Sequence, residues 1–499
     1  MTDPVTPCPT PFNMAAYVLR HAAMQPDKIA LSVLAPDGSD DLTYGDLNAA
    51  IGGTATGLRN SGLQAGDQVL MRLGNTPEFP IVYLACIMAG LIPVVTSAQL
   101  TAREITAMCA DLDPKLIVAA PDVALPERDI PVIDHVTITA FHNQPATAPV
   151  MGDPNRAAYI IFTSGTAGKP RAVLHAHRAV WARQMMWDGW EGLHASDRLL
   201  HAGAFNWTYT LGTGLLDPWA VGATALIAAP DTPATTLPLL LKRSGATIFA
   251  AAPGVYRQIL TSKIAQLPAL RHGLSAGEKL PPTIRAQWLA ATDTQIHEAF
   301  GMSECSTFLS GSPTHPAPDG TLGYPQSGRR VALIADGAPA DTGVIAVHRD
   351  DPGLMLGYVN HADETAAKFS GEWFLTGDMG RSDPSGAILY DGRVDDMMNT
   401  GGFRVSPVEV EEALRPHPDI VDIAVTEVTI KADASVIAAF YLSDDVIEGD
   451  ALAAYASARL ARYKTPRLFV RVKALPRGAN NKLLRRELRR IWEAAHGQA

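Results

Sequence analysis

One glycine-rich stretch, "YIIFTSGTAGKPRAV" (residues 159–173), places hydroxyl side chains and a lysine directly after a short apolar run. Its glycines let the backbone approach a ligand closely, and its hydroxyls and ammonium group suit an anion such as phosphate. The candidate ligands are Thr163, Ser164, Gly165, Thr166, Gly168 and Lys169. Pro170 follows the lysine where a P-loop has Ser or Thr, and Thr163 stands where its first glycine would be. The stretch therefore predicts a phosphate-binding loop of another kind; the alternative is a polar surface turn after a strand.

The bulk composition limits the classes of protein to be considered. The chain has 499 residues, of which 47% are hydrophobic and 18% charged, and this length predicts two or three domains. A formal net charge of -10 argues against nucleic acid or an anionic membrane as a partner. The cysteines are scattered without a CxxC pair, and the N-terminus shows no secretion signal. We therefore expect no zinc site, no disulfide framework and a cytoplasmic location.

Strand and helix patterns alternate through most of the chain. Apolar runs such as "QVLMRLG", "KLIVAA", "YIIF" and "ATIFAA" predict strands, and "LTYGDLNAAIGGTATGLRNSG" predicts a helix. The apolar run 79–95 is predicted as a buried helix that leads into a buried strand, because it is short for a membrane span. After Leu322 the segments "RRVALIA", "GVIAVHR" and "GAILYDG" predict a smaller β-rich subdomain. The expected fold class is α/β, with a large N-terminal domain of α/β subdomains plus this β-rich subdomain.

The C-terminal hundred residues differ in charge from the rest. Between Arg459 and Arg490 lie twelve basic residues and one acidic residue, Glu487. The patterns from "GRVDD" onward predict helix, strand, strand, helix (450–463), strand and a closing helix from Lys482. This is the size of a small α+β domain, so we place a domain boundary between residues 394 and 395.

Taken with the rest of the chain, the glycine-rich loop resembles the phosphate loop TSGTTGxPK of the adenylate-forming superfamily, which includes acyl-CoA synthetases and aryl-acid ligases. Ala167 and Arg171 depart from that motif. Five further motifs of the family follow in order: "SAGEKLP", "EAFGMSEC", "WFLTGDMGR", "YDGRVDDMMNTGGFRV" and "LPRGANNKLLRREL". The sequence pattern around "DPWAVGA" most resembles that of medium-chain and aryl acyl-CoA synthetases. The resemblance spans nearly the whole chain.

The resemblance implies a nucleotide site. Phe300 would stack on adenine, Ser303 would lie at the phosphates, Glu304 would hold Mg²⁺, and Asp378 would accept hydrogen bonds from the ribose. The remaining implied ATP or AMP ligands are Thr163, Ser164, Gly165, Thr166, Gly168, Lys169, Gly277, Glu278, Lys279, Glu298, Ala299, Gly301, Met302, Arg393, Arg404 and Lys482. Asn481 stands where the family has glycine, and asparagine tolerates the left-handed conformation better than most residues.

The resemblance also implies the chemistry. A carboxylic acid attacks ATP to give an acyl-adenylate and pyrophosphate, with Lys482, Glu304, Thr163 and Lys169 as catalytic residues. The C-terminal domain then moves about Asp395 as a hinge, and Gly401, Gly402 and Phe403 contact coenzyme A, which attacks through its thiol. The co-substrates are ATP, Mg²⁺ and coenzyme A, and the protein is expected as a monomer or homodimer.

The resemblance implies that the stretch 204–223 corresponds to the segment that lines the acyl pocket of the family. The implied acyl-binding residues are Phe205, Trp207, Tyr209 and Leu211 together with Gly301. The stretch contains no carboxylate before Asp217 to pair an amino group, and an unpaired buried ammonium is costly. We therefore expect an apolar aliphatic or aromatic monocarboxylic acid. Two alternatives stay open: a ligase that loads a carrier protein, and a non-catalytic nucleotide-binding member of the family.

Overall fold

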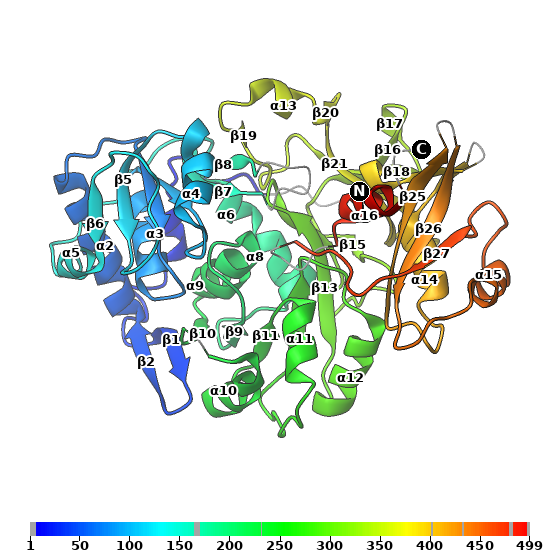
Figure 1. Ribbon diagram of the computed structural model, residues 1–499. Helices are drawn as coiled ribbons and strands as arrows, with labels where there is room; N and C mark the ends of the chain where they lie inside the picture. Colours follow the sequence, from blue (N-terminus) through cyan, green and yellow to red (C-terminus); the bar gives the residue numbers. More distant parts are fainter. Residues whose placement is uncertain are drawn as a thin grey trace. The chain divides into compact units, whose positions relative to one another are not determined.

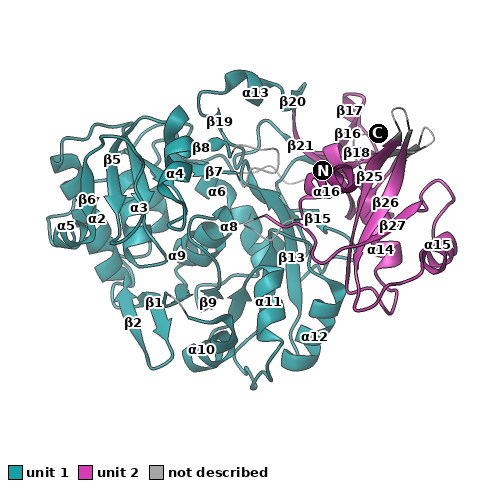
Figure 2. Ribbon diagram, viewed as in Figure 1, with its two compact units in different colours: residues 1–331, 347–372 teal, residues 332–346, 373–499 magenta. Residues whose placement is uncertain are grey.

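The computed structural model describes residues 6–163, 170–230, 232–400, 403–431, 434–478 and 483–496 (Figure 1). The chain forms two compact units (Figure 2): residues 1–331 with 347–372, and residues 332–346 with 373–499. The boundary predicted at 394/395 falls inside the second unit and stays a prediction. The mixed α/β architecture, with a large unit followed by a smaller one, confirms the predicted fold class.

The first unit contains a nine-stranded sheet in the order β15-β14-β13-β12-β11-β9-β10-β1-β2. From β13 to β1 neighbouring strands are parallel, and each edge is completed by antiparallel strands. The strands are β1 (Ile29–Ala35), β2 (Gly38–Thr43), β9 (Arg198–His201), β10 (Thr224–Ala228), β11 (Ile248–Ala250), β12 (His272–Ala276), β13 (Ile296–Met302), β14 (Ser306–Ser310) and β15 (Tyr324–Pro325). Tyr256, Phe249 and Trp288 pack ring against ring in the core beside this sheet.

A seven-stranded sheet of the same unit has the order β19-β8-β7-β4-β3-β5-β6. Its strands are β3 (Gln68–Arg72), β4 (Ile92–Val95), β5 (Pro114–Ala119), β6 (Val132–Asp134), β7 (Ala157–Phe162), β8 (Ala172–Ala176) and β19 (Gly357–Tyr358). The apolar run 79–95 forms the buried helix α3 (Glu78–Met88) followed by the buried strand β4, as predicted. Among the described residues, no helix combines the length and apolar character needed to cross a bilayer.

The other helices of the first unit are short, apart from α2 (Tyr44–Asn60), which begins at a capping box formed by Thr43 and Asp46. They are α1 (Met14–Val18), α4 (Ala102–Met108), α5 (His135–Phe141), α6 (Ala179–Ala182), α7 (Gln184–Met186), α8 (Thr208–Leu211), α9 (Asp217–Val221), α10 (Leu237–Ser244), α11 (Pro253–Ile259), α12 (Pro282–Thr292) and α13 (Ala362–Ala366), with the two-residue strand β20 (Phe369–Ser370).

The second unit begins with the predicted β-rich region. Its strands are β16 (Val331–Ala335), β17 (Ala338–Pro339), β18 (Thr342–His348), β21 (Trp373–Ser382) and β22 (Ile388–Arg393), arranged β17-β16-β18-β21 with β22 paired to β21.

The rest of the second unit is α+β. It contains the hairpin β23 (Met398–Thr400) and β24 (Phe403–Val405), the sheet of β25 (Asp422–Lys431), β26 (Ala434–Leu442) and β27 (Leu468–Arg471), and the helices α14 (Pro407–Leu414), α15 (Gly449–Ser457) and α16 (Arg485–His496). The prediction of a helix through residue 463 was wrong: α15 ends at Ser457, and the chain continues in turns, one of them closed by Lys464 N–H donating to Ala461.

Candidate active site

The predicted phosphate loop connects β7 to β8, which form an antiparallel hairpin. At the open end of this hairpin the amide of Thr163 donates to the carbonyl of Arg171 at 3.0 Å, and the amide of Arg171 donates back to Oγ1 of Thr163 at 3.0 Å. The guanidinium of Arg171 binds Glu364 of α13 through two bonds of 2.7 Å. Residues 164–169, which include Ser164, Gly165, Thr166, Gly168 and Lys169, lie outside the described residues.

The two predicted adenine motifs lie side by side because β12 and β13 are parallel neighbours. Ser275 pairs with Glu298 and Ala276 with Ala299, so both strands end at the same edge of the sheet. Loops at the carboxyl ends of parallel strands are where α/β proteins bind ligands. Gly277, directly after β12, has a φ of +95°, which favours glycine, and it opens the turn that carries Glu278 and Lys279.

Glu298 stabilises this edge of the sheet through two hydrogen bonds. Its Oε1 accepts a 3.0 Å hydrogen bond from the amide of Leu280, and its Oε2 accepts one of 3.1 Å from Arg285 on α12. Burial raises the pKa of Glu298 to about 6, against the lowering effect of these partners. The side chain that was predicted as a nucleotide ligand thus ties the turn after β12 to β13 and α12.

Phe300 and Gly301 occupy an irregularity in the pairing of β13 with β14. The ring of Phe300 contacts Phe308 edge to face, with 5.6 Å between centroids. A Cβ added to Gly301 would lie 2.2 Å from the carbonyl oxygen of Ser306 and 2.5 Å from Cα of Thr307. Met302 pairs with Ser306 at the end of β13. The backbone of β14 leaves room only for glycine at position 301.

Two residues from the seven-stranded sheet bind Ser303 and Glu304, at the end of the motif "EAFGMSEC". The Nε2–H of His175 on β8 donates to the carbonyl of Ser303 at 2.8 Å, and the hydroxyl of Tyr358 on β19 donates to Oε1 of Glu304 at 2.8 Å. Burial lowers the pKa of His175 to about 4, so its ring is neutral at neutral pH. Because β8 also bounds the phosphate loop, the structure brings the ends of that loop and the Ser303–Glu304 pair together. The sequence analysis missed both His175 and Tyr358, which no local pattern marks.

The predicted acyl-binding residues follow β9. Phe205 is buried against Phe79, with 5.5 Å between the ring centroids, and Trp207 immediately precedes α8. Tyr209 donates its hydroxyl to the carbonyl of Leu274 on β12 at 3.1 Å, which ties this segment to the edge that carries the adenine motifs. Leu211 lines a small cavity that is also lined by Tyr83, Tyr159, His175, Arg183 and Ser306.

Asp217, the first carboxylate after these residues, is fully buried and paired with Arg183. Nε of Arg183 donates to Oδ1 of Asp217 at 2.7 Å, and its Nη2 binds Oδ2. Arg183 also donates to Ser306 at 2.7 Å. The charge of Asp217 is thus neutralised by Arg183 inside the unit. Asp217 is therefore not free to pair with an amino group, which agrees with the predicted apolar acid.

The second unit positions the predicted ribose ligands. Asp378 on β21 lies directly opposite Arg393 on β22, and Nη1 of Arg393 is 3.2 Å from Oδ2 of Asp378. The hydroxyl of Tyr390 donates to Oδ1 of the same carboxylate at 3.1 Å. Asp378 is 7% exposed, so its orientation is fixed by these two neighbours.

The predicted hinge and the residues after it lie at the start of the α+β region. Asp395 is largely exposed, and its carboxylate is 3.8 Å from Arg486. Phe403 and Arg404 lie on β24, where Arg404 pairs with Asn399, but their side chains are outside the described part, as are Gly401, Gly402 and Lys482.

Two family models match the chain. The model of the AMP-binding enzyme matches residues 18–359, and the model of the AMP-binding enzyme C-terminal domain matches residues 409–482. Among curated relatives, acyl-coenzyme A synthetase ACSM2A, mitochondrial, of Homo sapiens is 30% identical over 463 residues, covering 86% of this chain and 80% of the relative. The benzoate–CoA ligase of Thauera aromatica is 29% identical over 489 residues and covers 91% of each chain.

Solved structures of CoA ligases share the fold. The anthranilate CoA ligase AuaEII, in complex with anthranoyl-AMP, superposes with a TM-score of 0.86 at 25% identity, covering 98% of this chain and 99% of that one. The benzoate CoA ligase of Burkholderia xenovorans LB400 gives 0.84 at 27% identity, covering 96% and 100%. With these likenesses along its length, and with the AMP-binding model alone matching more than half of it, the chain belongs to the family of AMP-binding enzymes.

Proposed function

We propose that the protein is an AMP-forming carboxylic acid:CoA ligase that activates an apolar aliphatic or aromatic monocarboxylic acid. One observation carries the proposal: the ends of the phosphate loop, the two adenine motifs and Glu304 meet within the first unit through the β12–β13 register and the His175–Ser303 and Tyr358–Glu304 hydrogen bonds. The relatives support the reaction class, since they are named as ligases that join acyl or benzoyl groups to CoA, and one structural neighbour holds an acyl-adenylate.

In the first half-reaction a carboxylate oxygen attacks the α-phosphorus of ATP, the bond to the β-phosphate oxygen breaks, and pyrophosphate leaves. Two anions must approach each other, so the protein contributes positioning and positive charge. Lys482 would lie between the carboxylate and the α-phosphate and reduce their repulsion. Asp378, held by Arg393 and Tyr390, would accept hydrogen bonds from the ribose hydroxyls, because an ionised carboxylate only accepts.

Glu304 fits a Mg²⁺ ligand. The residue is only 6% exposed and Tyr358 donates a hydrogen bond to its carboxylate, and carboxylate oxygens are ligands that Mg²⁺ prefers beside phosphates. When bound, the ion would neutralise charge on the departing pyrophosphate. The residues of the chain bind and orient the nucleotide around it.

In the second half-reaction a thiol attacks the acyl carbon of the adenylate, and AMP leaves. The thiol is proposed to come from coenzyme A. Three of the four cysteines, Cys86, Cys109 and Cys305, are buried, and burial raises the pKa of each of these thiols, which makes them poor nucleophiles. A motion of the C-terminal residues about Asp395 would remove Lys482 and admit the thiol.

The acyl pocket supports an apolar acid. Phe205, Tyr209 and Leu211 supply aromatic and aliphatic surface, and the nearby Asp217 carboxylate is paired with Arg183. Burying an ammonium group here would leave it unpaired, which costs several kcal/mol by an order-of-magnitude estimate. An amino acid is therefore disfavoured as the substrate.

The test is a panel assay. The protein is incubated with ATP, Mg²⁺ and benzoate or octanoate, with and without coenzyme A, and AMP and acyl-CoA are measured. AMP release that requires both an acid and free coenzyme A supports the proposal. Transfer only to a phosphopantetheinyl carrier protein supports the carrier-loading alternative, and ATP binding without turnover on any acid supports the non-catalytic one.

Lys482 is tested by Lys482→Ala, with Lys473→Ala, an exposed lysine of the same basic segment, as the matched control. The first variant should retain ATP binding but lose acid-dependent ATP–pyrophosphate exchange by several orders of magnitude, and the control should keep it. Unchanged exchange in Lys482→Ala would reject the proposed role of this lysine.

A further inference from the structure

Two described segments, one before and one after Lys482 in the sequence, pair with each other. Arg477 and Leu483 form an isolated antiparallel bridge, and the amide of Leu484 donates to the carbonyl of Pro476 at 2.9 Å. Residues 476–477 therefore lie beside residues 483–484. Contacts that fix residues 477 and 483–485 fix the described residues on both sides of Lys482 in the sequence, here called the first end (476–477) and the second end (483–485).

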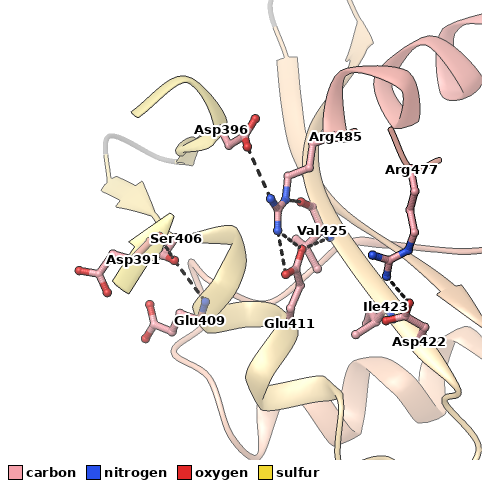
Figure 3. Close-up of polar contacts among 10 residues, drawn as sticks. All are labelled: Asp391, Asp396, Ser406, Glu409, Glu411, Asp422, Ile423, Val425, Arg477 and Arg485. Carbon is pink, nitrogen blue, oxygen red and sulfur yellow. Dashed lines mark hydrogen bonds and ion pairs between the residues drawn. The ribbon is translucent and has the colours of Figure 1, made fainter. Parts of the chain in front are cut away.

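Arg485 fixes the second end from inside the unit (Figure 3). Its Nη2 donates to both carboxylate oxygens of Glu411 on α14 at 2.8 Å, and its Nε donates to the carbonyl of Val425 on β25 at 3.3 Å. Its Nη1 lies 3.5 Å from Asp396, the residue after the predicted hinge. The Arg485 side chain is 12% exposed and that of Glu411 6%, so this arginine joins four segments in a nearly dry environment.

The acceptor Glu411 is itself held in place. Its Oε1 accepts a 2.8 Å hydrogen bond from the amide of Val425, so the carboxylate links α14 to β25 before it meets Arg485. Burial lowers the pKa of Arg485, but the charge and hydrogen bonds of Glu411, together with Asp396 and Tyr390, outweigh burial and raise the pKa. The guanidinium therefore stays charged. Its planar set of N–H donors can bind both carboxylate oxygens of Glu411, a geometry that an ammonium group does not provide.

Arg477 fixes the first end in a weaker manner. Its Nη2 donates to Oδ2 of Asp422 at 2.8 Å, while Oδ1 of Asp422 accepts from the amide of Ile423 at 2.9 Å. Both side chains of this pair are about one-third exposed (35% and 31%), so water screens it more than the Arg485 pair. Asp422 and Val425 both belong to β25. The two arginines thus attach the residues before and after Lys482 to the same strand.

We propose that Arg485, assisted by Arg477, is a positioning residue for Lys482: the two arginines lock the described residues on either side of Lys482 to β25, and Arg485 also binds α14 and the segment after the hinge. The proposal rests on the proposed function of Lys482 in adenylate formation. Fixed flanking residues limit where the lysine amine can reach, and a displacement of about 1 Å can cost on the order of 100-fold in rate.

The experiment separates the half-reactions. Adenylate formation is followed by acid-dependent ATP–pyrophosphate exchange, and thioester formation is followed from preformed benzoyl-AMP and coenzyme A, a step in which Lys482 takes no part. Arg485→Gln should lower exchange about 10- to 100-fold and change thioester formation less than about threefold. Arg477→Gln should lower exchange less, by about 3- to 10-fold, because its pair is partly exposed. Arg490→Gln, on the exposed face of the same helix, is the matched control and should change neither rate.

Two further variants make the outcome decisive. Arg485→Lys keeps the charge but loses the planar set of donors, so it should show the same selective loss even where Arg485→Gln does not fold. In a Lys482→Ala background, Arg485→Lys should cause no further loss of exchange, because the group that it positions is gone. Equal losses in both half-reactions, or the same fold-loss in the Lys482→Ala background, would overturn the positioning role. Absence of acid-dependent exchange in the unaltered protein would instead overturn the proposed function itself.

Discussion

Tyr358 and Glu304 are joined by a 2.8 Å hydrogen bond from the tyrosine hydroxyl to Oε1 of the carboxylate, across 54 positions of sequence. Tyr358 lies on β19 of the seven-stranded sheet, and Glu304 follows β13 of the nine-stranded sheet. The bond therefore links the two sheets of the first unit near the start of the proposed phosphate loop. Groups that orient a metal-binding carboxylate commonly tune the affinity of the site for the metal.

Tyr358→Phe is expected to raise the Mg²⁺ concentration needed for half-maximal pyrophosphate release by about 10-fold, because Glu304 loses a hydrogen-bond donor to its carboxylate. The measurement is a Mg²⁺ titration of acid-dependent pyrophosphate release. Tyr83→Phe is the matched control, since the buried Tyr83 hydroxyl has no hydrogen-bond partner among the described residues. An unchanged Mg²⁺ dependence in Tyr358→Phe would contradict the assigned role of the bond.

Glu191→Gln is expected to change the free energy of unfolding by less than about 1 kcal/mol. Burial, reinforced by the nearby charge of Asp217, raises the pKa of Glu191 well above its usual range, so the uncharged Gln side chain resembles the form that burial favours. Asp217→Asn should cost about 3–5 kcal/mol, because it leaves the buried Arg183 without its counter-charge. Urea unfolding at pH 7 measures the free energy of unfolding of each variant. An equal loss of unfolding free energy in Glu191→Gln and Asp217→Asn would contradict the expectation that Glu191 tolerates loss of its charge.

Gly301→Ala is expected to destabilise the protein by several kcal/mol, or to prevent folding, by an order-of-magnitude estimate for a side chain forced into backbone. The added Cβ would meet backbone atoms of Ser306 and Thr307, which cannot rotate away. Gly254→Ala is the control, because a Cβ on Gly254 in α11 has nothing within 4 Å and should stabilise by up to about 1 kcal/mol. Equal thermal midpoints for the two variants would contradict the proposed contact.

Glu298 should make stability depend on pH. Its pKa of about 6 in the folded protein exceeds the ordinary 4.5, so the folded state holds the proton more tightly than the unfolded chain does. Stability is then lost as pH rises between these values, by about 2 kcal/mol in total. Glu298→Gln removes this titration and keeps an acceptor for the Leu280 amide. The free energy of unfolding of the variant, measured in urea relative to that of the unaltered protein, should rise by about 1–2 kcal/mol between pH 5 and pH 7.5. A difference in unfolding free energy that does not change with pH would contradict the raised pKa.

The strands and helices that the sequence predicted best are those with a purely local signal. The segments at β7, β11 and α3–β4 are continuous apolar runs between glycines and prolines, which is typical of elements covered on both faces in a parallel sheet. The end of α15 was placed wrongly, because the residues after Ser457 keep a helix-compatible composition while turns and tertiary contacts decide where the helix stops.

Side-chain pairing could not be predicted, because it depends on which segments the fold brings together. Arg477 and Arg485 lie within the motif "LPRGANNKLLRREL", but nothing in the motif shows that they pair with Asp422 and Glu411, which lie far from them in the sequence. Tyr358 sits in an ordinary "LMLGYVN" segment, and only the pairing of β19 with β8 directs it to Glu304. The motifs located the candidate site, whereas the residues that orient its members came from the structure.

The second unit takes its first sheet from two separate stretches of the chain, since β16 and most of β18 are made before residues 347–372 of the first unit, and β21 and β22 after them. On a translating ribosome β18 therefore emerges with one edge unpaired until β21 follows, seconds later at roughly 5–20 residues per second. An unpaired edge is a template for non-native association. Translational pausing within this interval would thus expose the nascent chain to aggregation or chaperone capture, long before the segment that contains Lys482 is synthesised.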